Sequence, residues 1–140
     1  MAASLMLPRL LARAALIIPL LGACFTCWAL LDSGTPANLS EWIVNIPWFI
    51  GQILPYAFMS IGIWKFREMF GLLMLVASGA ALLTGFAIYD FMNAVILHPD
   101  AQSALLFIFI PLYQCCLFAL IFVAALAVRW FSRHRRPNAA

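Results

Sequence analysis

The fold of this chain is decided by the uncharged stretch at residues 69–89, MFGLLMLVASGAALLTGFAIY. An α-helix rises about 1.5 Å per residue, so roughly 20 apolar residues are enough to cross the hydrocarbon core of a bilayer. This stretch has that length, and its few polar residues are small or stand at its end. It therefore predicts a transmembrane helix.

Three more uncharged stretches occupy residues 14–31, 47–64 and 104–128. The chain has 140 residues, of which 66% are apolar and 9% are charged, and this composition excludes an ordinary soluble domain. We therefore expect an all-α membrane protein: an antiparallel bundle of four transmembrane helices in one polytopic domain, 1–140. The predicted helices cover residues of about 10–31, 47–64, 69–89 or slightly beyond, and 104–130.

Basic and acidic residues alternate between these stretches. The bases precede the first stretch, separate the second from the third, or follow the fourth: Arg9, Arg13, Lys65, Arg67, Arg129, Arg133, Arg135 and Arg136. Most acids lie in the other two gaps: Asp32, Glu41, Asp90 and Asp100. Because cytoplasmic loops carry the excess of Lys and Arg, both termini are predicted to be cytoplasmic. This orientation accounts for the net charge of +3 without a nucleic-acid partner. The basic tail at residues 129–136 is also a candidate for binding anionic lipid headgroups, although orientation alone is enough to explain it.

A bacterial inner membrane is the expected location. A eukaryotic membrane stays open, in which case Asn38-Leu39-Ser40 is a glycosylation sequence on the luminal side. Local signals refine the helices. Pro19 lacks an amide hydrogen and should bend the first helix. A short interfacial helix is expected over residues 39–45, with Pro47 starting the second span. The third helix is expected to project beyond the membrane by a turn or two, to residue 97.

Polar residues mark one face of the second helix and the middle of the fourth. Gln52, Tyr56 and Ser60 follow one another at intervals of four and so lie on one stripe. Tyr113 and Gln114 lie near mid-depth of the fourth helix. Since unpaired polar groups are costly in lipid, the stripe should face the bundle. Gln52 or Tyr56 is then expected to pair with Gln114 or Tyr113.

The third helix carries a packing signal and an acid. Ala77, Ala81 and Gly85 repeat every four residues, the pattern that lets membrane helices approach closely. Asp90 falls just inside the expected interface, and an intramembrane acid is a functional candidate. Its expected partner is His98 or a tyrosine. The surrounding loop, which also holds Asp100, matches no metal-ligand spacing, so a solvated loop is the favoured interpretation.

Four cysteines supply the redox-like feature of the sequence. Leu21-Gly22-Ala23-Cys24 resembles a lipoprotein signal with Cys24 as the lipidated residue, but the apolar run continues after it without a polar tether. Cys24-x-x-Cys27, with Cys115 and Cys116, resembles at a distance the membrane disulfide-generating oxidoreductases and the vitamin K epoxide reductase group. Those need a cysteine partner outside the membrane, and neither outer gap contains one. No base lies near Cys24 or Cys27 to activate a thiol, so structural filler is favoured.

No motif for nucleotides, hydrolysis or zinc occurs, and no cofactor is expected. In size the chain is similar to the small multidrug transporters and the small fluoride channels. The multidrug transporters have an acid in the middle of their first helix, and this chain has none there. The favoured function is non-enzymatic contact with a membrane protein: an immunity-type protein against a membrane-active toxin, or an accessory subunit. A thiol-redox enzyme and a small permease or channel are the alternatives. A homo-oligomer stays open.

Overall fold

The computed structural model of the chain describes residues 2–32, 38–93 and 103–134. Within them the secondary structure is helical and contains no strand. The elements are α1 (Ala2–Ala15), α2 (Ile17–Asp32), α3 (Leu39–Lys65), α4 (Phe70–Phe91) and α5 (Ser103–His134). The expected helical extension to residue 97, and the side chains of His98, Asp100, Arg135 and Arg136, lie outside the described residues.

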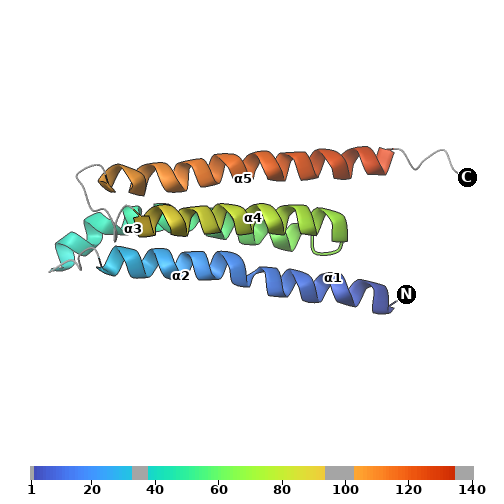
Figure 1. Cartoon of the computed structure of the whole chain (residues 1–140), viewed down its shortest axis with the longest axis horizontal. Helices are drawn as coiled ribbons and strands as arrows, with labels where there is room; N and C mark the ends of the chain where they lie inside the picture. Colours follow the sequence, from blue (N-terminus) through green and yellow to red (C-terminus); the bar gives the residue numbers. More distant parts are fainter. Residues whose placement is uncertain (1, 33–37, 94–102, 135–140) are drawn as a thin grey trace, which may run out of the picture.

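Among the described residues, four helical segments are long and apolar enough to cross a membrane, as the sequence predicts. They are Met6–Asp32, Ile46–Lys65, Phe70–Phe91 and Ile108–Ser132. The helices lie side by side along a common direction, and the start of α1, the turn between α3 and α4, and the last turn of α5 lie toward the same end (Figure 1). The described part of the chain therefore has the features of a multi-pass membrane protein.

The first span is broken into two helices at Leu16. Pro19 has no amide hydrogen to donate to the carbonyl of Ala15, four residues earlier, and α1 ends at that residue. Backbone hydrogen bonds from Leu16 to Ala12 (3.1 Å) and from Leu20 to Leu16 (3.4 Å) keep the two halves nearly in line. The irregularity that Pro19 predicts is thus present, as a break between α1 and α2 (Figure 1).

The separate interfacial helix predicted over residues 39–45 is wrong. Instead α3 runs from Leu39 through Pro47 and Pro55 to Lys65 without ending. A proline inside a membrane helix removes one hydrogen bond, which neighbouring helices and small backbone adjustments can offset. The first turns of α3 slant away from the bundle instead of forming their own element (Figure 1). The fourth helix is also longer than the predicted 104–130: α5 runs from Ser103 to His134.

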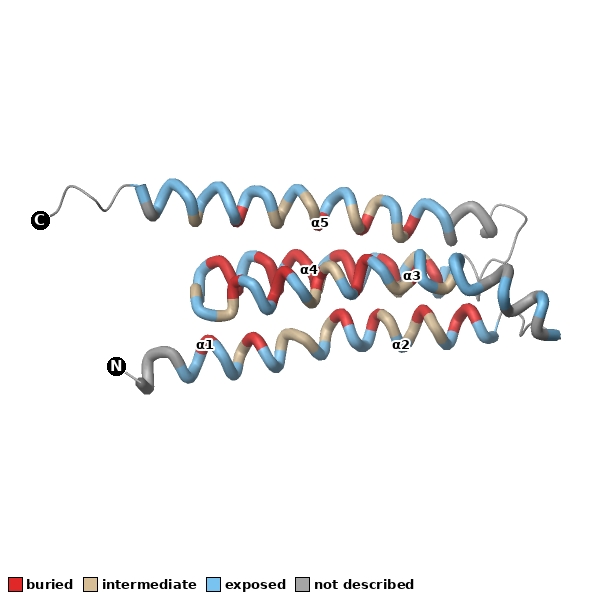
Figure 2. Tube along the Cα trace, turned by 180° about the vertical axis from the view of Figure 1, so that it is seen from behind, coloured by how far each residue is buried: buried red, intermediate tan, exposed pale blue. Residues whose placement is uncertain are grey.

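The core lies around α4. In the apolar 18-residue stretch that marks α4 as a membrane span, half of the residues are buried, against 22% in the corresponding stretch of α5. The other helices therefore cover α4 most (Figure 2). Its buried face meets Met59 and Ile63 of α3, Phe66 of the turn that follows α3, and Phe118 of α5 in one apolar cluster. The helices approach closely where α4 carries Gly79: a Cβ added there would lie 2.7 Å from Ile121.

Candidate functional site

A chain of hydrogen bonds links all four spans inside the bundle. The hydroxyls of Thr26 in α2 and Tyr56 in α3 lie 3.0 Å apart. The Tyr56 hydroxyl also bonds the side chain of Gln114 in α5. Gln114 in turn donates from Nε2 to the backbone carbonyl of Leu83 in α4, at 3.2 Å. Thr26, Tyr56 and Gln114 are at most 3% exposed, and we call these three residues the polar cluster.

Gly22 makes room for the polar cluster. It lies one turn before Thr26 in α2 and is buried. A Cβ added at Gly22 would collide with the Tyr56 ring and lie 2.7 Å from Cγ2 of Thr84. The hydroxyl of Thr84 contacts the sulfur of Met59 at 3.8 Å on the same buried side of α4. The backbone of α2 can therefore come close enough to α3 and α4 for the hydroxyl contact to form.

The polar stripe predicted for the second span divides in the structure. Gln52 and Tyr56 are both 3% exposed and face the bundle, and the bond from Tyr56 to Gln114 is one of the pairings expected from the sequence. Ser60 is different: its hydroxyl donates to the backbone carbonyl of Tyr56 at 2.8 Å. Such a bond satisfies Ser60 within its own helix, so it adds nothing to the contacts between helices.

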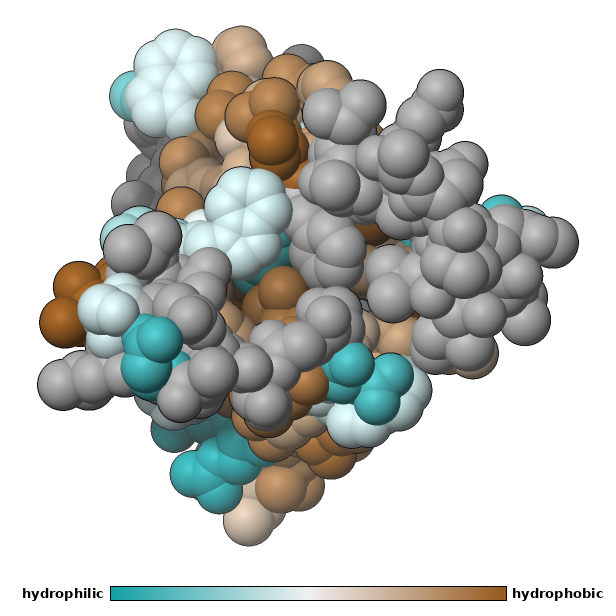
Figure 3. Space-filling model, turned by 90° about the vertical axis from the view of Figure 1, so that its left-hand side faces the viewer, coloured by the Kyte–Doolittle hydropathy of each residue, from teal (hydrophilic) through white to brown (hydrophobic). Residues whose placement is uncertain are grey.

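Asp90 has a tyrosine partner. The hydroxyl of Tyr113 in α5 donates to Oδ2 of Asp90 in α4 at 3.1 Å, and both residues are half-buried. The Tyr113 ring meets the edge of Phe86, with centroids 5.9 Å apart. Asp90 lies near the end of α4 that faces away from the basic residues. Seen from that end, hydrophilic atoms form separate patches between apolar ones (Figure 3).

The small residues predicted as the packing face of the third span have unequal surroundings. Ala77 is buried, Ala81 is half-buried and Gly85 is exposed, with no atom within 4 Å of an added Cβ. Ala77 and Ala81 line a shallow apolar groove between α4 and the first span. The close approach of α5 uses Gly79 instead. Gly85 therefore makes no packing contact with the described residues that a side chain would disturb.

The cysteines are free thiols. Cys24 and Cys116 are exposed, and Cys27 and Cys115 are half-buried. Among the described residues, no group of three or more His, Cys, Asp or Glu side chains could hold a metal ion. The geometry thus brings none of these thiols into a ligand set in the described part of the chain.

The sequence interpretation missed the contacts at the basic end of the bundle, because it explained the bases by orientation and considered a ligand, lipid headgroups, only for the tail at residues 129–136. Arg9 and Glu68 form an ion pair at 3.1 Å, with both side chains 55% exposed. The guanidinium of Arg67 lies 3.9 Å from the centre of the Trp64 ring, a cation–π contact. A Glu and a Trp next to the bases of the short turn at residues 65–68 are the signal that could have indicated these contacts.

Comparisons of the chain with protein-family models, with curated proteins and with solved structures find no match.

Proposed function

We propose that this chain is a bacterial inner-membrane protein that acts by contact with another membrane protein, without catalysing a reaction. In this proposal it forms an antiparallel four-span bundle with both termini in the cytoplasm. The gathering of bases at the end where α1 starts and α5 finishes supports that orientation, because cytoplasmic ends carry the excess of Lys and Arg.

The observation that carries the proposal is how the polar groups inside the spans are used. Thr26, Tyr56 and Gln114 are buried and bond one another or backbone. A catalytic or transport site needs polar groups that remain available to a substrate in a cavity. In the polar cluster these groups hold helices together, which supports a role as a stable surface for a partner.

The partner surface is proposed to lie around the Asp90–Tyr113 pair. This pair is half-buried, so it remains within reach of a neighbouring chain, and the ring of Phe86 beside it is 56% exposed. An acid near the end of a span is expensive unless it is paired, and such residues commonly mark functional contacts. A toxin that inserts into the membrane, or the core subunit of a membrane complex, fits this surface.

Site-specific photo-crosslinking in intact cells tests the proposal. A benzophenone amino acid replaces Phe86 and, as matched control, Leu120, which is 67% exposed on α5 and lies about two helical turns beyond Tyr113. We expect a discrete protein adduct from position 86, reduced by Asp90→Asn, and only lipid adducts from position 120. Equal adducts from both positions, or none from position 86, would contradict the assigned surface.

Two checks on the same strain separate the alternatives. Replacing Cys24, Cys27, Cys115 and Cys116 by Ala should leave the adduct unchanged, whereas its loss from a protein that still inserts would favour thiol chemistry. A periplasmic reporter fused after Arg136 should be inactive, and activity would overturn the orientation. The neighbouring genes then distinguish the two forms of the proposal: a secreted toxin supports an immunity protein, and the genes of a membrane complex support an accessory subunit.

A further inference from the structure

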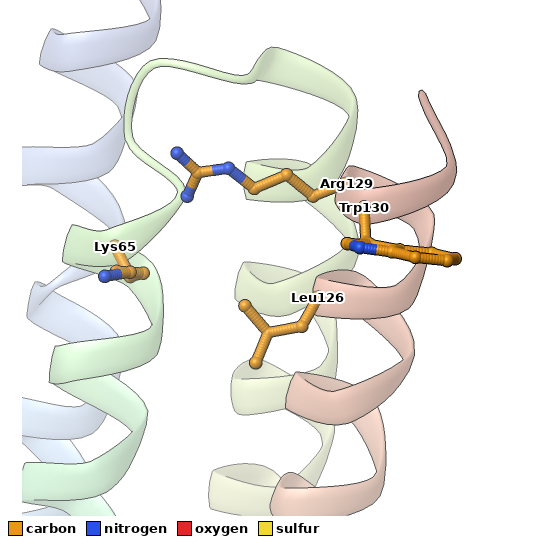
Figure 4. A pocket seen from close by; sticks show the side chains of 4 residues that line it. All are labelled: Lys65, Leu126, Arg129 and Trp130. Carbon is orange, nitrogen blue, oxygen red and sulfur yellow. The ribbon is translucent and has the colours of Figure 1, made fainter. Parts of the chain in front are cut away.

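A pocket of about 380 Å³ opens at the basic end of the bundle. Lys65, in the last turn of α3, and Leu126, Arg129 and Trp130 of α5 line it. Arg129 reaches from α5 toward the turn between α3 and α4, Leu126 points into the intervening space, and Trp130 lies on the outer side (Figure 4). A neighbouring pocket of about 260 Å³ shares Lys65 and Arg129, so the two spaces are adjacent.

Among its described lining residues the pocket holds two cations and no acid. Glu68, the one acid between the second and third spans, lines the neighbouring pocket and is paired with Arg9. Within the described residues, Nε of Arg129 is buried and has no hydrogen-bond partner. A buried donor without a partner carries a desolvation cost, and two positive charges beside one cavity repel each other. A bound anion removes both costs.

We propose that this pocket binds the phosphate headgroup of an acidic phospholipid. A guanidinium presents parallel donors that match two phosphate oxygens, and Lys65 supplies a point charge on the opposite side. Leu126 lies within the membrane-spanning segment Ile108–Ser132, where the glycerol and the first acyl carbons of a lipid would lie. Trp130 is an aromatic residue of the kind that favours the headgroup level.

The mixed lining favours a lipid over a free phosphate ion. Two of the four lining side chains, Leu126 and Trp130, offer apolar surface that an inorganic ion would not use. Both are also exposed on the outer surface of α5, at 37% and 56%, so a lipid could reach the pocket sideways from the bilayer. The site is distinct from the Asp90–Tyr113 surface and does not depend on the proposed function.

Spin-labelled lipids in vesicles test this site. The full-length protein is placed in phosphatidylcholine vesicles that contain traces of spin-labelled phosphatidylglycerol or phosphatidylcholine, and the immobilised fraction of each lipid is compared. The measurement uses salt of about 1 M, at which the Debye length is about 3 Å and diffuse surface attraction is screened. We expect the wild type to prefer phosphatidylglycerol over phosphatidylcholine.

Lys65→Gln or Arg129→Gln should reduce this preference about fivefold each, the contribution of one base near an anionic headgroup. Lys65→Arg should keep it. The matched control is Arg13→Gln, because Arg13 is an exposed base that lines a different pocket at the same end. Added millimolar phosphate should not release the lipid.

Three results would overturn the proposal. The first is a preference that survives the double substitution at Lys65 and Arg129. The second is an equal loss in Arg13→Gln, which would mean that net charge and not the pocket selects the lipid. The third is release of the lipid by inorganic phosphate, which would assign the pocket to the free ion.

Discussion

The polar cluster and the Lys65–Arg129 pocket use polar side chains in opposite ways. In the polar cluster each described group has a partner, and its three residues are at most 3% exposed. In the pocket two cations share an open space, and a buried donor of Arg129 lacks a partner among the described residues. Satisfied polar groups inside a membrane stabilise the fold, while unsatisfied ones at its edge are available to a ligand.

The largest expected effect on stability comes from a substitution at Gly22, beside the polar cluster. Gly22→Ala places a methyl group against Tyr56 and Thr84, so the helices must separate and the bonds of the polar cluster must lengthen. Overpacking of this kind costs about 1–3 kcal/mol. The expected result is a clearly lower midpoint of thermal unfolding in mild detergent.

Gly85→Ala is the matched control for this prediction. It adds the same methyl group to another membrane helix, in open space, and should leave the midpoint unchanged or slightly raised, since Ala favours helix over Gly. Similar losses in both variants would show that Gly22 has no special packing role. A large loss from Gly85→Ala alone would instead place the packing face on Ala77, Ala81 and Gly85.

The bonds of the polar cluster can be measured separately from its packing. Tyr56→Phe removes the hydroxyl but keeps the ring over Gly22, and Gln114→Met keeps the approximate volume of the side chain. Each should lower the free energy of unfolding by about 0.6–2 kcal/mol, the usual range for hydrogen bonds between membrane helices. The double variant should lose less than the sum, because the two side chains bond each other.

The pocket variant Lys65→Gln sharpens the contrast. It should leave the free energy of unfolding in detergent nearly unchanged, because Lys65 is exposed and shares its pocket with another cation, Arg129, so that it gains no attraction there. Tyr56→Phe, in turn, should leave lipid preference unchanged.

Strictly additive effects of Tyr56→Phe and Gln114→Met would mean that the hydrogen bond between Tyr56 and Gln114 contributes nothing to stability.

The helical spans could be predicted from the sequence because composition and length determine them almost alone. An uncharged stretch such as residues 69–89 has few alternatives to a membrane helix. The cost of unpaired polar groups in lipid also predicted that Gln52 or Tyr56 pairs with Gln114 or Tyr113, and the pairing of Tyr56 with Gln114 is one of those four. These inferences needed no knowledge of which helices are neighbours beyond the assumption of a single bundle.

Other features required three-dimensional information. Thr26 looks like another small residue in a run of apolar ones, and only the position of α2 against α3 makes its hydroxyl a partner of Tyr56. Likewise the repeat of small residues every four positions favours Gly85 as a packing residue, but Gly79, outside that repeat, is the glycine that faces α5. Lys65 and Arg129 are 64 positions apart in the chain. Their shared pocket depends on where α5 crosses the end of α3, which no local pattern specifies.

The smallest effect is expected at the Arg9–Glu68 ion pair. This pair lies at the basic end of the bundle, as the pocket does. Unlike the two cations of the pocket, its charges are opposite and lie 3.1 Å apart. Both side chains are 55% exposed, so water screens the attraction, and exposed pairs contribute about 0–1 kcal/mol. A double-mutant cycle of Arg9→Gln and Glu68→Gln should give a coupling energy within that range at low salt and near zero at about 1 M salt. A coupling that persists at high salt would mean that the pair is shielded from solvent. The ion pair would then stabilise the α3–α4 turn much as the polar cluster stabilises the packing of the spans. The exposed contacts at the basic end and the buried contacts of the polar cluster would differ less in energy than their exposures indicate.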